Sequence, residues 1–125
     1  EVHAGDVHAL FGHGLRRRID LRVELMMRAG LLEEAARVRA MQPGQTALQA
    51  IGYKELLGVL HGTCSMDDAV AALKLATRHY AKRQITWFSA RPYVRWIDAD
   101  TEDGAMRPAQ DILSDALHCI REAQA

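Results

Sequence analysis

The chain has 125 residues, with 16 basic and 16 acidic side chains, 49% hydrophobic residues, nine Gly and three Pro. This composition is typical of a globular domain and excludes a disordered, collagen-like or disulfide-stapled chain. The sequence has no apolar run of the length of a membrane-spanning helix, and residues 1–14 lack the basic start and apolar run of a signal peptide. We therefore expect a soluble, cytoplasmic protein in which Cys64 and Cys119 are free thiols.

Apolar residues recur at helical spacing along the first half of the chain. Residues 15–29 and 31–41 predict two helices separated at Gly30, since a helix end favours a residue that adopts a positive φ. Residues 46–62 (TALQAIGYKELLGVLHG) predict a short helical turn, a break at Gly52 and a second helix. The first half is therefore expected to be helical throughout.

The second half predicts two further helices and one short strand. Ser65 and Asp68 have the spacing of an N-terminal cap, so a long helix is expected after Ser65, ending before Pro92. Residues 94–97 alternate like a β-strand, and Pro108 is suited to the first turn of a last amphipathic helix. Because one strand makes no sheet, residues 94–97 either pair with strands outside this chain or lie extended over helices. The predicted fold is mainly α.

The charges are distributed unevenly along the chain. Residues 74–95 carry six cations and no acid, a local charge of +6, whereas residues 98–125 carry −5. Lys74, Arg78 and Lys82 lie four residues apart, so on a helix they form one basic stripe. Two interpretations remain open: the stripe binds RNA, or it is neutralised by the acidic C-terminal region.

Three blocks resemble the C-terminal half of the tRNA dimethylallyltransferases, in the same order and with similar spacing. The blocks are LRRRIDLRVELMMRAGLLEE, TALQAIGYKELLGVLHG and TRHYAKRQITWF, followed by VRWID. The resemblance covers residues 15–98 and implies the helical C-terminal portion of a P-loop-type α/β prenyltransferase. Residues 1–14 match the family poorly, and residues 99–125 form an acidic tail with a terminal amphipathic helix.

The resemblance implies transfer of a dimethylallyl group from dimethylallyl diphosphate to N6 of an adenosine beside the tRNA anticodon. The sequence has no G-x-x-x-x-G-K-[ST] loop, on which ATP or nucleotide binding in the family would rest, so we expect this chain alone to be inactive. Mg²⁺ is implied as the cofactor, with its protein ligands outside this chain. The complete enzyme is expected to be a monomer that binds the anticodon stem-loop and no membrane. The alternative is a stand-alone helical RNA-binding or protein-interaction module without catalysis.

The resemblance assigns Arg22 to contact with the diphosphate. A guanidinium suits this role, because its planar fork binds phosphate oxygens in pairs. Spacing alone favours the alternative that Arg22 is a surface residue in the i,i+4 interactions of a solvated helix face.

Two segments resemble those that face tRNA in the family, QAIGYK at residues 49–54 and KRQITWFS at residues 82–89. The predicted tRNA-binding residues are Gln49, Ala50, Ile51, Gly52, Tyr53, Lys54, Lys82, Arg83, Gln84, Ile85, Thr86, Trp87, Phe88 and Ser89. Lys54, Lys82 and Arg83 can neutralise phosphates, and the two glutamines offer amides to base edges.

We expect different roles for the aromatic side chains in and near these segments. Tyr53 is expected to stack on an unpaired base. The rings of Trp87 and Phe88 are expected to pack in the core at the end of the long helix, as is Tyr80. No metal site is expected, because the histidines of the N-terminal region recur every five residues, a spacing that fits no helix face and no common zinc motif.

Overall fold

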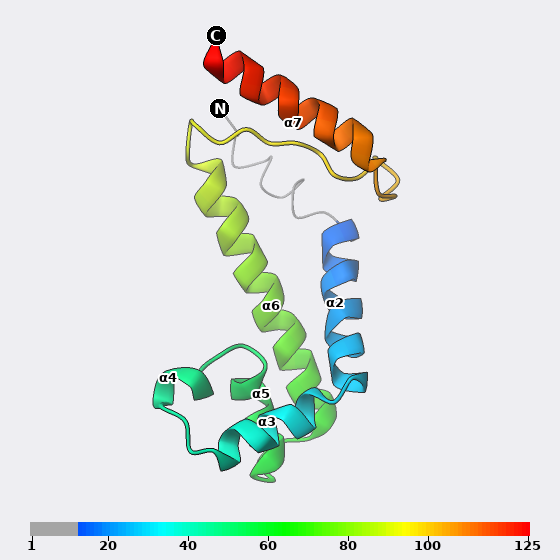
Figure 1. Ribbon diagram of the computed structural model, residues 1–125. Helices are drawn as coiled ribbons and strands as arrows, with labels where there is room; N and C mark the ends of the chain where they lie inside the picture. The colour runs from blue at the N-terminus through cyan, green and yellow to red at the C-terminus, as the bar shows by residue number, and fades with distance from the viewer. Residues whose placement is uncertain (1–12) are drawn as a thin grey trace.

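The computed structural model of the chain describes residues 13–125, which fold into a helical assembly (Figure 1). The helices are α2 (His13–Arg28), α3 (Leu31–Ala40), α4 (Gln45–Leu48), α5 (Tyr53–Leu60), α6 (Met66–Ser89) and α7 (Ala109–Gln124). The mainly α fold is therefore confirmed. The expectations for residues 1–12, including most of the poorly matching leader and its first two histidines, lie outside the described residues.

The helix ends follow local sequence signals. Gly30 separates α2 from α3 with a φ of 99°, and Gly52 precedes α5 with a φ of 104°, both in the left-handed region that favours glycine. The backbone N–H of Gly52 donates to Glu55 Oε2 at 2.8 Å, which caps α5. The backbone N–H of Asp68 donates to Ser65 Oγ at 3.1 Å, so the predicted cap of α6 is confirmed.

The core lies where α6 meets the shorter helices. Ala35 of α3, Leu56 of α5 and Ala69 of α6 form one buried cluster. Helix α2 also packs against α6, where Val23 of α2 and Leu73 of α6 are buried. Helix α6 is thus the central element against which α2 and α5 are fixed.

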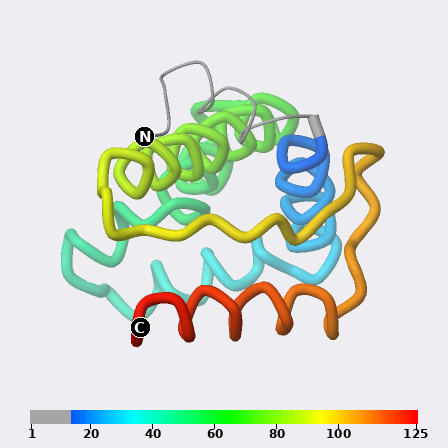
Figure 2. The backbone as a smooth tube through the Cα atoms, turned by 90° about the horizontal axis from the view of Figure 1, so that it is seen from above, coloured from blue at the N-terminus to red at the C-terminus, as the bar shows by residue number. Residues whose placement is uncertain are grey.

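Residues 94–97 do not form the predicted strand. They are extended but have no ladder partner, and the β-pairing in the described part of the chain is an isolated bridge between Asp100 and Met106. Alternation of side chains favours an extended backbone, but a β-strand also needs a neighbouring strand with which to form hydrogen bonds. Instead, the segment between α6 and α7 runs between α7 and the α2–α6 pair (Figures 1 and 2). Arg18 Nη2 donates to Asp100 Oδ2 at 2.7 Å and ties this segment to α2.

Three aromatic side chains expected in the core are half exposed instead. Tyr80 is 49% exposed, Trp87 50% and Phe88 44%. The expectation was wrong because the residues that α6 buries, Ala69 and Leu73, both lie in its N-terminal half. Beyond them, the C-terminal half of α6 extends past α5 (Figure 1). None of the helices in residues 13–125 is both long enough and apolar enough to cross a membrane.

Candidate functional site

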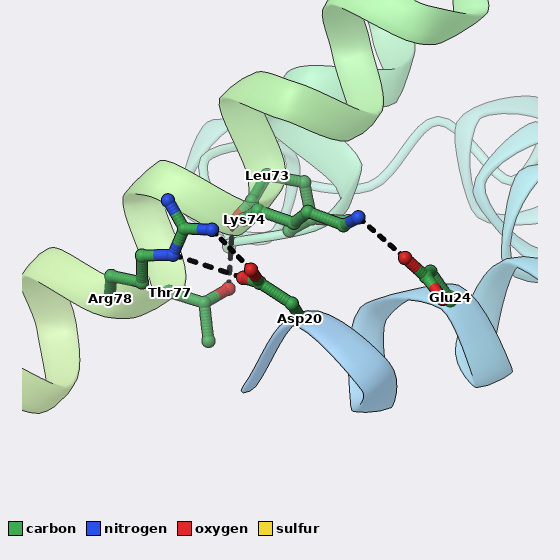
Figure 3. A network of polar contacts seen from close by, with 6 residues as sticks. All are labelled: Asp20, Glu24, Leu73, Lys74, Thr77 and Arg78. Carbon is green, nitrogen blue, oxygen red and sulfur yellow. Dashed lines mark hydrogen bonds and ion pairs between the residues drawn. The ribbon is translucent and has the colours of Figure 1, made fainter. Parts of the chain in front are cut away.

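Two ion pairs join α2 to α6 and use part of the basic stripe (Figure 3). One edge of the Arg78 guanidinium donates two hydrogen bonds to the Asp20 carboxylate, with Nε 3.0 Å from Oδ1 and Nη2 bonded to Oδ2. One helical turn away, Lys74 Nζ donates to Glu24 Oε1 at 2.8 Å. This hydrogen bond from Lys74 holds the pKa of Glu24 below its ordinary value. Lys74 and Arg78 therefore fix the α2–α6 packing.

The ladder of ion pairs ends before Lys82. The two pairs advance by one turn on each of two antiparallel helices, so the next pair along would join Lys82 to residue 16, which is Arg16. Two cations do not form an ion pair. Within residues 13–125 the structure shows no ion pair for Lys82, Arg83, Arg91 or Arg95. Of the six cations in residues 74–95, the four without an ion pair among the described residues therefore lie near the C-terminal end of α6 and just beyond it.

The acidic C-terminal region does not neutralise the stripe in the described structure. Asp100 pairs with Arg18 of α2, and Asp115 accepts from Arg107 Nη2 at 2.8 Å. The hydrogen bond to Asp115 raises the pKa of Arg107. The interpretation in which residues 74–95 pair with the tail therefore receives no support from these contacts.

Asp20→Ala is expected to lower the free energy of unfolding by about 1–2 kcal/mol, because it leaves the partly buried Arg78 without its carboxylate. Glu24→Ala is the matched control: Glu24 is 46% exposed, so its loss should cost less than about 1 kcal/mol. Urea denaturation of both variants measures the difference. Equal losses would show that the Asp20 pair contributes no more than an ordinary surface pair.

The C-terminal half of α6 presents an open groove of about 460 Å³. Among the described residues it is lined by His79, Lys82, Arg83, Thr86 and Trp87. Four of the five residues carry a polar or basic group and the fifth is aromatic, although most of the surface that lines the groove is apolar. A surface of this composition fits the phosphates and bases of an unpaired nucleic acid strand.

The aromatic rings of this region are in contact with arginines. The Arg83 guanidinium lies 5.8 Å from the centroid of Tyr80, and that of Arg91 lies 4.1 Å from the centroid of Trp87. Phe88 packs edge-on against Trp87, with centroids 5.0 Å apart and an interplanar angle of 86°. The sequence does not single out Arg91; the only signal is its spacing of four residues from Trp87.

The remaining residues of the second predicted segment have varied surroundings. Gln84 is exposed and Ile85 is half buried. Thr86 Oγ1 donates to the Lys82 carbonyl at 2.9 Å, and Ser89 Oγ is buried without a hydrogen-bond partner among the described residues. The segment, which is the last part of α6, therefore combines exposed and half-buried positions.

The first predicted segment, residues 49–54, lies at the junction of α4 and α5. Its exposed members are Gln49, Ala50, Ile51 and Lys54. Gly52 is buried, and Tyr53 is half buried against the core cluster. The Tyr53 hydroxyl donates to Glu34 Oε1, which raises the pKa of Tyr53. Stacking by Tyr53 stays a prediction.

The structure does not bring the two segments together. Helices α4 and α5 lie beside the N-terminal half of α6, while residues 82–89 form its other end (Figure 1). A ligand that contacts both Lys54 and Lys82 must therefore extend along α6, as a nucleic acid strand would.

Arg22 is exposed on α2, and its side chain has no hydrogen bond or ion pair with any residue from 13 to 125. Its neighbour one turn away, Arg18, is already bound to Asp100. Of these two arginines, Arg22 therefore has the guanidinium free for an external anion. The described residues hold no cluster of three or more His, Cys, Asp or Glu side chains that fits a metal ion.

Comparison with known proteins shows which family this chain resembles. The family described as IPP transferase matches residues 11–91. A tRNA dimethylallyltransferase of Shouchella clausii is 50% identical over 82 residues, covering 66% of this chain and 26% of that protein. One from Desulforamulus reducens is 44% identical over 100 residues, covering 79% of this chain and 35% of that protein.

Solved structures agree with the sequence comparison. A tRNA Δ(2)-isopentenylpyrophosphate transferase of Staphylococcus epidermidis superposes with a TM-score of 0.71 at 35% identity, over 89% of this chain and 34% of that one. The full-length tRNA isopentenylpyrophosphate transferase of Bacillus halodurans gives 0.69 at 34% identity, over 86% and 36%. The chain thus spans roughly a quarter to a third of the length of these relatives. With the family match extending over most of its residues, the chain belongs to the IPP transferase family.

Proposed function

We propose that this chain is the C-terminal part of a tRNA dimethylallyltransferase. Residues 15–98 are its transferase segment, and residues 99–125 are an accessory acidic tail. The observation that carries the proposal is the division of the basic stripe: Lys74 and Arg78 hold α2, while Lys82 and Arg83, beside an exposed tryptophan, make no ion pair within residues 13–125. The names of the relatives, which are tRNA dimethylallyltransferases, support tRNA as the ligand of this surface.

In the proposed reaction, N6 of an adenosine attacks the allylic carbon of dimethylallyl diphosphate. A C–N bond forms, the C–O bond to the diphosphate breaks, and the amine loses its proton to a base outside this chain. Negative charge grows on the leaving diphosphate, so a positioned cation stabilises the transition state more than the ground state. Arg22 is our candidate for that cation, because its exposed guanidinium makes no ion pair with residues 13–125.

The wider setting follows the family. We propose that the RNA partner is an anticodon stem-loop, that the complete enzyme is a cytoplasmic monomer, and that Mg²⁺ is bound by ligands outside this chain. Nucleotide binding likewise belongs to a phosphate-binding loop that this sequence lacks.

Replacing Lys54, Lys82 and Arg83 by alanine tests the RNA surface. Each phosphate contact to a single strand contributes about 0.7 to the slope of log affinity against log salt, so the triple variant should flatten that slope by about 2 and weaken binding of an anticodon stem-loop. Titration at several salt concentrations gives the slope.

The matched control removes the same charge elsewhere. Arg28, Arg37 and Arg121 are exposed and make no ion pair within the described residues. Replacing these three by alanine should leave the salt slope close to that of the unchanged chain. If both triple variants flatten the salt slope equally, the change in RNA affinity reflects net charge alone, and the proposed RNA surface is wrong.

A further inference from the structure

The indole of Trp87 is held on one face and at one edge. The Arg91 guanidinium carbon lies 4.1 Å from the ring centroid, within the range of a cation–π contact. Phe88 meets Trp87 in a T-shaped arrangement at 5.0 Å. Despite these two neighbours, Trp87 remains 50% exposed. The ring is therefore oriented by its neighbours and still open to solvent.

Arg91 reaches the ring from just beyond the end of α6. The helix ends at Ser89, and the backbone N–H of Arg91 donates to the Phe88 carbonyl at 3.1 Å in the turn that follows. Arg91 follows Trp87 by four residues in the sequence, and in this turn its guanidinium lies over the indole ring. The contact links the backbone at the helix end to the orientation of the ring.

The charge around the exposed ring is positive. Trp87 lines the same groove as Lys82 and Arg83, which have no ion pairs among the described residues. The sequence from residue 74 to residue 97 contains no acidic side chain. An aromatic face bordered by cations is complementary to an unpaired nucleotide, whose base stacks and whose phosphate is anionic.

We propose that Trp87 is a stacking platform for one unpaired base of the bound RNA, and that Arg91 is a positioning residue that holds the indole in place. The proposal rests on the proposed function, because it names how the RNA surface recognises a single-stranded loop. Arg91 acts through Trp87 in this arrangement and does not itself contact the RNA.

Fluorescence of Trp87 gives a direct test of stacking. The chain contains two tryptophans, Trp87 and Trp96, so Trp96→Phe leaves Trp87 as the single reporter. Two RNA probes are used: a stem-loop, and the same stem-loop with abasic loop nucleotides that keep every phosphate. We expect the stem-loop to quench Trp87 fluorescence and the abasic probe to quench it much less. Trp87→Ala should weaken stem-loop binding about 5- to 100-fold and leave binding of the abasic probe unchanged.

A double-mutant cycle tests the role of Arg91. Arg91→Ala should weaken stem-loop binding about 2- to 5-fold in the parent chain and have no further effect in the Trp87→Ala background. The salt slope should stay unchanged, and Arg91→Lys should restore part of the affinity. Arg95→Ala is the control: it removes an exposed cation from the same region, and its effect should be the same with or without Trp87.

Each contrary result has a distinct meaning. If Arg91→Ala lowers the salt slope by about 0.7 and weakens binding equally without Trp87, Arg91 is a phosphate contact and the positioning role is wrong. If Trp87→Ala lowers the melting temperature while stem-loop affinity is unchanged, the ring packs within the protein and the platform is wrong. If the charge-removal variants behave as proposed but both RNA probes quench Trp87 equally, the platform fails and the RNA surface stands. If the parent chain binds neither probe, both proposals fail.

Discussion

In the complete enzyme that carries this segment, Arg22→Ala is expected to slow prenyl transfer about 100-fold. Loss of one charge-stabilising contact to a developing anion costs about 3 kcal/mol of transition-state stabilisation. The residue is exposed and makes no ion pair in the described structure, so its removal should not disturb folding. Single-turnover rates at saturating tRNA and dimethylallyl diphosphate measure the effect, and tRNA affinity should change little.

Two further variants separate the role of the planar guanidinium of Arg22 from the effect of its positive charge alone. Arg22→Lys keeps the charge but loses the planar fork, so it should recover only part of the rate. Arg17→Ala removes another exposed cation from the same helix and should leave the rate nearly unchanged. An Arg22→Ala enzyme that turns over at the parent rate would remove Arg22 from the site, and the arginine would be an ordinary residue of a solvated helix face.

Local sequence signals predicted the helices well because each signal acts within one turn of the chain. Gly30 and Gly52 adopt the positive φ that their positions imply, and the Ser65 hydroxyl accepts from the Asp68 N–H. These features depend on neighbours three or four residues away. The strand expected at residues 94–97 failed because pairing depends on a partner that alternation does not specify.

The roles of the basic residues could not be separated from the sequence. Lys74, Arg78 and Lys82 occupy equivalent positions of one helical stripe, so their spacing predicts the same role for all three. The difference arises from a helix far away in the chain: Asp20 lies 58 residues before Arg78. The packing of α2 on α6 pairs two of the cations with acids, whereas Lys82 has no ion pair among the described residues. Which charges are free for a ligand is therefore a property of tertiary structure.

The aromatic residues show the same dependence on distant packing. Tyr80 lies on the same helical face as Ala69 and Leu73, so its spacing predicts burial. The described structure covers only the first part of that face, and Tyr80 is 49% exposed. Hydrophobic spacing predicts which side of a helix is apolar, but the length over which that side is covered depends on the elements packed against it.

Leu56→Ala is expected to lower the free energy of unfolding by about 2–5 kcal/mol, a large part of the total stability of a domain of this size. Leu56 is 0% exposed and belongs to the cluster that joins α3, α5 and α6. Truncation removes apolar contact and leaves a cavity, since Ala35 and Ala69 are too small to fill it. Urea denaturation of the chain measures the loss.

Leu75→Ala is the matched control for Leu56→Ala, because the same atoms are removed from a side chain on α6 that is 50% exposed. Its cost should stay below about 1 kcal/mol. Because α5 carries the segment around Lys54 and packs directly on α6, a Leu56→Ala chain should also lose the fixed spacing between Lys54 and Lys82. Its affinity for a stem-loop should then fall even at temperatures where the chain keeps its helical circular dichroism signal. If stability falls by several kcal/mol while stem-loop affinity is retained under those conditions, the two predicted segments bind RNA independently, and the α3–α5–α6 cluster has no part in arranging them.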